Sequence, residues 1–272
     1  MKRIPSLLAA LLFLLASSFP GPAAAETIDL TILHINDFHG NLLPKPGKEG
    51  KPATGGMARI ARMVAEEREK NPGGTLLLSA GDMFQGTPVS NLFRGKPVIE
   101  AMNRMGFDAM TVGNHEFDWG MEAFDDLRQA AAFPFLSANI VDGQGALLPG
   151  VKPYILVRKK GLKIAVIGIT TPETHYATKP GNLRGYRVIA VEKVLPALIA
   201  KVRQEGAGTV IVLSHMGLDE DRETASKVGG IDLIVGGHSH TEVKTAVAVG
   251  STIIVQAGYY GQHLGVLKIA VD

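Results

Sequence analysis

The sequence predicts an α/β fold built on a mixed sheet or on two packed sheets. Short apolar, β-branched runs alternate along the chain with segments whose apolar residues repeat at helical spacing, which is the pattern of α/β proteins. The end of the chain has two strand-like runs, 252–256 and 264–271, with no helical pattern between them. These two runs are expected to be consecutive antiparallel strands, which would make the sheet mixed.

The first half of the chain predicts strands and helices in alternation. Residues 28–35 alternate apolar and polar side chains over part of their length, as a strand does. Apolar side chains then repeat at i, i+3, i+4 and i+7, which predicts a helix with one buried face: Met57, Ile60, Ala61 and Val64. The remaining runs predict strands at 75–79, 109–112 and 135–140, and helices at 97–105 and near 121–131.

The second half begins with a predicted hairpin, in which 154–158 pairs with 163–170 across a Lys-Lys-Gly turn. An amphipathic helix follows, and Pro196 lies off its apolar stripe. Because proline inside a helix removes a hydrogen bond, Pro196 either kinks a helix that begins near Val191 or lies in the first turn of one that begins near Leu195. Strands are expected at 209–213 and 231–235.

Residues 1–25 predict a cleaved signal peptide. Lys2 and Arg3 precede an apolar run over 7–15, and three alanines then offer a cleavage site before Glu26. The alternative is an N-terminal anchor, but the run is shorter than the roughly 20 residues that span a bilayer. We expect a periplasmic or secreted protein with no stable membrane anchor after cleavage and a single catalytic domain over 26–272.

Charge and cysteine content exclude several classes of function. The chain has 28 basic and 26 acidic residues. Lys2 and Arg3 lie in the predicted leader, which has no acid, so 28 − 2 leaves 26 basic residues against 26 acidic ones. A neutral chain does not predict docking to nucleic acid. With no cysteine, any metal must be held by imidazole, carboxylate or amide oxygen, which favours manganese, zinc, iron or cobalt.

Five short polar segments, each after an apolar run, together supply the donors of a site for two divalent metal ions. Sites of open α/β folds form outside the carboxyl ends of strands, where these segments are expected to meet. The segments are Asp37-Phe38-His39, Gly81-Asp82, Gly113-Asn114-His115-Glu116-Phe117-Asp118, Ser214-His215 and Gly237-His238-Ser239-His240.

Each segment alone also has a simpler interpretation. Asp82 can bridge two ions, but a turn aspartate commonly bonds its own backbone. Asn114 can offer its amide oxygen to a metal or cap the following helix. His215 alone would more often be a packed core histidine, and the two histidines of the last segment could be surface residues. Because all five segments occur together in one chain, we favour a shared site, with His115 facing the substrate and Asp118 orienting its imidazole.

This constellation resembles the calcineurin-like metallophosphoesterases, and it is most similar to their secreted 5'-nucleotidase family, which includes the periplasmic 5'-nucleotidase/UDP-sugar hydrolases. Residues 55–56, 80–86 and 136–140 also carry the resemblance. It implies a four-layer α/β/β/α sandwich with mixed sheets and His115 with Asp118 as the catalytic dyad. The implied first metal site is Asp37, His39, Asp82 and His240. The implied second site is Asp82, Asn114, His215 and His238. Position 240 is glutamine or histidine among relatives.

The resemblance implies an exported hydrolase of phosphoric esters with two divalent metal ions, of the 5'-nucleotidase phosphomonoesterase type. A hydroxide that bridges the ions would attack phosphorus, and His115 would protonate the leaving oxygen of a small phosphate ester or nucleotide. One alternative is a thiosulfohydrolase of sulfur oxidation on the same scaffold. Another is a truncated module that binds metal and phosphate with low turnover. The nucleotidases it resembles carry a further C-terminal domain that grips the nucleotide, so we expect weak base specificity of this chain.

Overall fold

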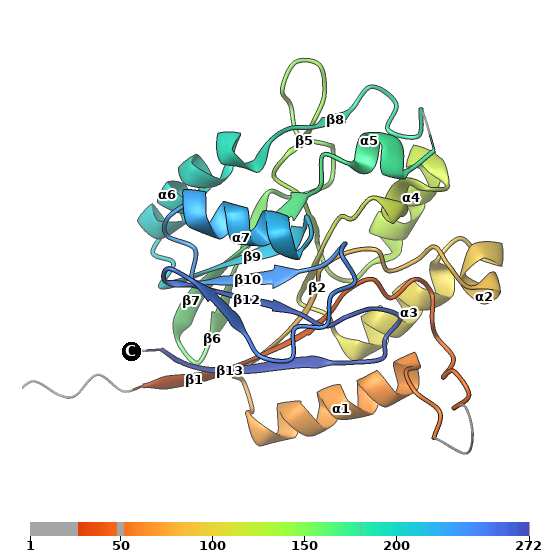
Figure 1. Ribbon diagram of the computed structural model, residues 1–272, viewed down its shortest axis with the longest axis horizontal. Coiled ribbons are helices and arrows are strands. Elements are labelled where there is room, and N and C mark those ends of the chain that lie inside the picture. Colours follow the sequence, from red (N-terminus) through yellow and green to blue (C-terminus); the bar gives the residue numbers. More distant parts are fainter. Residues whose placement is uncertain (1–26, 48–51, 180, 272) are drawn as a thin grey trace, which may run out of the picture.

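The computed structural model describes residues 27–47, 52–179 and 181–271 (Figure 1). The predicted signal peptide lies outside these residues. Within the described ranges, no helix combines the length and the apolar character that crossing a bilayer requires.

The first sheet has the strand order β13-β1-β2-β3-β4. Four strands run parallel and β13 is antiparallel to its neighbour β1. The strands are β1 (Ile28–Ile35), β2 (Thr75–Ser79), β3 (Ala109–Thr111), β4 (Phe135–Leu136) and β13 (Gly265–Val271).

The second sheet has the order β11-β12-β10-β9-β7-β6. Its inner strands are parallel and both edge strands are antiparallel to their neighbours. The strands are β6 (Tyr154–Lys159), β7 (Leu162–Thr170), β9 (Thr209–His215), β10 (Leu233–Gly236), β11 (Val247–Val249) and β12 (Thr252–Gln256). A small third sheet pairs β5 (Ile140–Val141) with β8 (Arg187–Val188).

Helices lie on the outer sides of the two large sheets (Figure 1). The α-helices are α1 (Met57–Lys70), α2 (Pro88–Leu92), α3 (Lys96–Met105), α4 (Gly120–Ala130), α5 (Thr174–Ala177), α6 (Leu195–Gln204) and α7 (Leu218–Lys227). Two 3₁₀ turns, η1 (His115–Phe117) and η2 (Val191–Lys193), precede α4 and α6.

Three apolar cores define the layers. On β1, Leu30 and Ile32 belong to the core between the two sheets, whereas Leu33 and Ile35 belong to the core under α1, α3 and α4. This split follows from the alternation of side chains along a strand. The third core joins the second sheet to α6 and α7, with Ile199 of α6 among its members. The predicted four-layer α/β/β/α sandwich with mixed sheets is therefore confirmed.

Several predicted elements match the structure closely. The strands at 28–35, 75–79 and 252–256 have the predicted bounds. The hairpin of β6 and β7 is present as predicted. Of the two interpretations of Pro196, the second is correct, because α6 begins at Leu195 and the proline lies in its first turn.

Two predictions about strands were wrong. The run 135–140 is two strands, because the chain leaves the first sheet after Leu136 and the backbone N–H of Ala138 donates to Gly168 of β7. The runs 252–256 and 264–271 are not antiparallel neighbours, since β12 lies in the second sheet and β13 pairs with β1 in the first. The segment between them crosses from one sheet to the other, where the N–H of Tyr260 donates to the carbonyl of Asp37.

Candidate metal centre

The predicted site residues meet at one edge of the molecule, where the carboxyl ends of strands from both sheets lie together. The loops after β1, β2 and β3 bring in residues from the first sheet, and β9 and the loop after β10 bring in residues from the second. The residues that meet there are Asp37, His39, Asp82, Asn114, His115, Asp118, His215, His238 and His240.

A first cluster joins Asp37, His39 and His240. The Nε2 atoms of the two histidines are 3.2 Å apart, and His240 Nε2 is 3.4 Å from Asp37 Oδ1. His39 Nδ1 lies 2.8 Å from the carbonyl of Gln85 and donates to it, so its Nε2 carries a lone pair. Imidazole nitrogens and a carboxylate that face one another in this way form a ligand set for a cation.

A second cluster joins Asp82, His215 and His238. His215 Nε2 is 3.1 Å from Asp82 Oδ2 and 3.2 Å from Asn114 Oδ1, while its Nδ1 donates to the carbonyl of Ala80 at 2.6 Å. Asn114 makes no side-chain cap to the following helical turn, so its amide oxygen is directed at the site.

Asp82 lies between the two clusters. Its Oδ2 is 4.0 Å from His39 Nε2 of the first cluster and 3.1 Å from His215 Nε2 of the second. A carboxylate in this position can give one oxygen to each of two ions.

The electrostatics of the site fit a pair of divalent cations. Burial raises the pKa of Asp82, but the charge and hydrogen bond of His215 and the charges of His115 and His39 together hold the pKa below its usual value. Burial likewise lowers the pKa of His215, but the charge and hydrogen bond of Asp82, together with the charge of Asp37 and the bond to Ala80, raise it to about 10. Burial and the neighbouring Asp82 raise the pKa of Glu116 to about 7. The positive charge of His215 balances Asp82 here, and a divalent ion bound to both would supply that charge in place of the proton. Nitrogen and oxygen donors suit first-row transition metals.

Backbone strain concentrates at the same residues. Asp37, His39, Asp82, His238 and His240 all have positive φ, between 48° and 73°. Side chains of L-residues rarely adopt this region, and each such residue costs on the order of 1–3 kcal/mol. Strain of this kind persists only where the surrounding structure holds it, and such residues cluster at functional sites.

His115 and Asp118 form a pair beside the first cluster. His115 Nδ1 is 2.6 Å from Asp118 Oδ2, and the ring lies edge-on to His39 with 5.2 Å between ring centroids. The hydroxyl of Thr178 donates to Asp118 Oδ1 at 2.8 Å and fixes the carboxylate. Burial lowers the pKa of His115, but the hydrogen bond to Asp118 and the charge of Asp82 raise it to about 9.

A cavity of about 600 Å³ is lined by His115 and by members of both clusters, among them His39, Asp82, His238 and His240. Lys45 and Tyr260 form part of its wall, with Lys45 Nζ 3.9 Å from the centre of the Tyr260 ring. Tyr259 stacks on His240, with 5.0 Å between ring centroids. The cavity is thus open to a small anionic molecule on one side and closed by the predicted ligands on the other.

Sequence reasoning missed two residues that hold the ligands. Asn36 Nδ2 donates to Asp37 Oδ2 at 2.6 Å, and its Oδ1 accepts from the N–H of Ala257 at 2.9 Å. Glu173 Oε2 lies 3.0 Å from His238 Nε2. The position of Asn36 directly before Asp37 was a usable signal, whereas nothing in the local sequence indicates Glu173.

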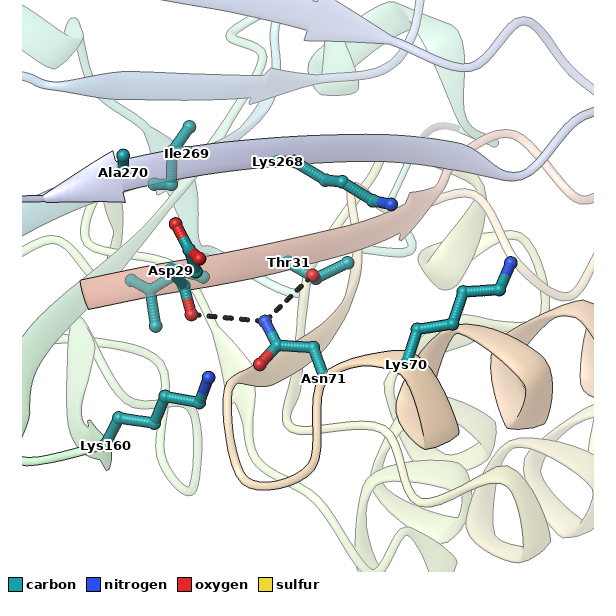
Figure 2. A pocket seen from close by; sticks show the side chains of 9 residues that line it. Asp29, Thr31, Lys70, Asn71, Lys160, Lys268, Ile269 and Ala270 are labelled. Carbon is teal, nitrogen blue, oxygen red and sulfur yellow. Dashed lines mark hydrogen bonds between the residues drawn. The ribbon is translucent and has the colours of Figure 1, made fainter. Parts of the chain in front are cut away.

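A second groove, of about 420 Å³, lies at the opposite end of β1. Figure 2 shows Asn71 there, donating to the carbonyl of Asp29 and to Thr31, with Lys70, Lys160 and Lys268 around the groove. Among the residues that the structure describes, both groups of possible metal ligands lie at the other end of the strand, by Asp37. We therefore assign the chemistry to the cavity that faces the clusters.

Comparison with known proteins agrees with the fold. The chain is 37% identical over 276 residues to a snake venom 5'-nucleotidase of Crotalus adamanteus. The aligned region covers 92% of this chain and 46% of that protein. A 5'-nucleotidase precursor from Thermus thermophilus superposes with a TM-score of 0.80 at 32% identity, covering 90% of this chain and 52% of the other. A sulfate thiohydrolase from Thermus thermophilus, in complex with glycerol, has a TM-score of 0.80 at 25% identity, covering 89% and 56%.

The chain thus spans about half the length of the relatives it matches. The sequence profile of the family described as calcineurin-like phosphoesterase matches residues 30–242, which include both ligand clusters and the pair of His115 and Asp118. Most of the chain lies within this match, and this protein belongs to the calcineurin-like phosphoesterase family.

Proposed function

We propose that this chain hydrolyses phosphoric monoesters of small molecules, in the manner of a 5'-nucleotidase. The observation that carries this proposal is the position of Asp82 between two clusters of nitrogen and oxygen donors, with His115 beside them on the same cavity. The relatives named 5'-nucleotidase support the substrate class.

The ligand sets would hold two divalent ions, such as manganese, zinc, iron or cobalt. When bound, the ions supply Lewis acid chemistry, which polarises phosphoryl oxygens and activates water. Asp37, His39 and His240 would hold one ion and Asn114, His215 and His238 the other, with Asp82 shared.

His115 would serve as the general acid. Asp118 accepts from Nδ1, which fixes the orientation of the ring and leaves Nε2 for the oxygen of the leaving group. The backbone N–H of His115 also donates to Asp82 Oδ1 at 2.9 Å, so the acid and the shared ligand are fixed relative to each other. The cavity wall at Lys45 adds positive charge for an anionic substrate.

Metal reconstitution tests this proposal. The chain is stripped with a chelator and reloaded with manganese or zinc. It should then hold two ions per chain, because each cluster has its own donors and Asp82 lies between them. The reloaded chain should hydrolyse p-nitrophenyl phosphate and AMP. Elemental analysis gives the ratio and release of phosphate gives the rate. One ion per chain together with full activity would contradict a binuclear centre.

Thiosulfohydrolysis is the second candidate function, and the structural similarity to the sulfate thiohydrolase favours it. The two functions differ in the atom attacked, which is sulfur in one case and phosphorus in the other. Turnover of thiosulfonates without turnover of p-nitrophenyl phosphate or AMP would select the second function.

We expect this chain to discriminate weakly among nucleobases. Among the described residues that line the cavity, Tyr260 is the one phenol ring, and its face carries the Lys45 ammonium. Stacking on aromatic side chains contributes about 1–3 kcal/mol per base, so a cavity whose described lining offers a base no free aromatic ring should bind nucleotides more weakly and show a higher KM. Values of kcat/KM for AMP, GMP, UMP and p-nitrophenyl phosphate should lie within roughly tenfold of one another, since a tenfold ratio is only about 1.4 kcal/mol. A strong preference for one base would contradict this prediction.

Export is part of the same proposal. The signal-like composition of residues 1–25 and the venom origin of one relative support a periplasmic or secreted protein. Mass spectrometry of the protein from the periplasmic or secreted fraction should find Glu26 as its first residue. Recovery of the full-length chain from the cytoplasm would contradict export.

A further inference from the structure

We infer that Glu116 is a positioning residue that builds the second metal site by fixing Asp82 relative to Asn114. This inference rests on the proposed pair of metal ions. Glu116 is not a ligand in either cluster, and it touches neither the substrate cavity nor the dyad side chains.

The carboxylate of Glu116 binds two separate loops through three backbone N–H groups. Its Oε2 accepts from Asp82 N at 2.9 Å and from Gly113 N at 2.6 Å, and its Oε1 accepts from Met83 N at 2.9 Å. One loop carries Asp82 and the other leads directly into Asn114. Two neighbouring ligands of the second site are thus held by one side chain.

The loop at Asp82 needs such a clamp. Asp82 has a φ of 56°, in the left-handed region, and Gly81 before it has a φ of 88°. This conformation costs free energy and persists only where contacts determine it. Two of the three N–H groups that Glu116 binds, those of Asp82 and Met83, flank the Asp82 side chain in the backbone and so fix the direction in which its carboxylate points.

The space between the two loops has no room for an alternative arrangement. A Cβ atom added to Gly113 would lie 2.3 Å from Asp82 Oδ1 and 2.8 Å from Glu116 Oε2. The side chain of Glu116 is 1% exposed, so water cannot replace its hydrogen bonds. The carboxylate of Glu116 therefore helps to set the distance between Asp82 and Asn114, together with the hydrogen bond from the N–H of His115 to Asp82 Oδ1.

The first cluster is held by different contacts. Asp37 is bound by Asn36, and the backbone N–H of His238 donates to the same Asp37 oxygen at 3.0 Å. His39 is bound by the carbonyl of Gln85. The backbone N–H of His39 also donates to the carbonyl of Asp82 at 3.0 Å, so the first ion also depends on this loop through Asp82. The second ion depends on both Asp82 and Asn114, so loss of the Glu116 clamp should weaken the second ion more than the first.

Glu116→Gln tests the inference with little change in shape. The amide oxygen can take the place of Oε2 for Asp82 and Gly113, but the amide N–H₂ then faces the N–H of Met83, donor against donor. Titration of the metal-free protein with manganese should show the second ion bound roughly 10–100-fold more weakly, the usual effect of losing an outer ligand contact. The first ion should be weakened less, because among its ligands only the shared Asp82 is held by Glu116.

Two readouts separate positioning from simple destabilisation. Calorimetry gives the affinity of each ion, and electron paramagnetic resonance distinguishes a coupled manganese pair from a single manganese ion. Glu122→Gln is the matched control, since Glu122 is an exposed residue of the adjacent helix and the same charge is removed. If Glu116→Gln does not fold, Glu116→Asp keeps the charge but is too short to span both loops, and the same selective loss of the second ion is expected.

The outcomes are distinguishable. Wild-type protein that binds two ions, with Glu116→Gln or Glu116→Asp weakened more at the second ion than at the first, supports the inference. Two ions bound by the variant with wild-type affinity, or equal weakening of both ions, overturns it and leaves the proposed function intact. Wild-type protein that binds one ion overturns the binuclear proposal and this inference together.

Discussion

Asp82→Asn should remove binuclear metal binding and nearly all turnover. Asp82 is 2% exposed and faces both His39 and His215, so the substitution removes the one negative charge that both clusters share. Loss of an outer contact to a ligand costs roughly 10–100-fold in metal affinity, and loss of a shared ligand should cost more. The metal content after dialysis and kcat at saturating manganese measure the two effects.

His240→Gln should be much milder than Asp82→Asn. His240 contributes to the first cluster alone, and its side chain is 36% exposed at the edge of the cavity. Glutamine keeps an oxygen donor at this position and leaves Asp37 and His39 in place. Asp126→Asn, an exposed change on α4, controls for the loss of a carboxylate. A greater loss in His240→Gln than in Asp82→Asn would contradict the assignment of Asp82 as the shared ligand.

The strands that carry the site could be predicted because almost all of their residues are buried. β2 has five buried residues, and β9 is buried along its whole length. Helix α7 could not be predicted, because its buried side chains include the polar Asp221 and Thr224, so no apolar stripe marks the helix. The sheet to which β13 belongs could not be predicted either, since β-pairing between distant strands leaves no local signal in an alternating sequence.

The residues that converge at the candidate site could be predicted because each lies at, or within a few residues of, the carboxyl end of a strand, where a parallel sheet brings polar loops together. Residues that act through hydrogen bonds were harder to find. Glu173 is 65 positions from His238, and Glu116 is 34 positions from Asp82, so the sequence separates each from its partner. Sequence pattern thus predicts donors that converge at the edge of a sheet, whereas the contacts that orient them require the three-dimensional structure.

His115→Ala should retain both metal ions and lose roughly 10²–10⁴-fold in kcat, the usual contribution of a positioned general acid. The metals should remain because the contact between His115 and Asp82 is made by the backbone N–H, which alanine keeps. Elemental analysis and phosphate release measure the two properties on the same sample. Release of an ion from His115→Ala would show that its imidazole is a ligand instead.

The leaving group provides the sharper test of this role. An acid that protonates the leaving oxygen matters less when the leaving group is already a stable anion, so His115→Ala should lose less with p-nitrophenyl phosphate than with AMP. Asp118→Asn should show the same pattern in milder form, because it weakens the hydrogen bond to Nδ1 that orients the ring but keeps the imidazole. Equal losses in kcat for both substrates would mean that His115 stabilises the transition state without protonating the leaving oxygen. A loss confined to AMP places the proton of His115 on the oxygen that leaves.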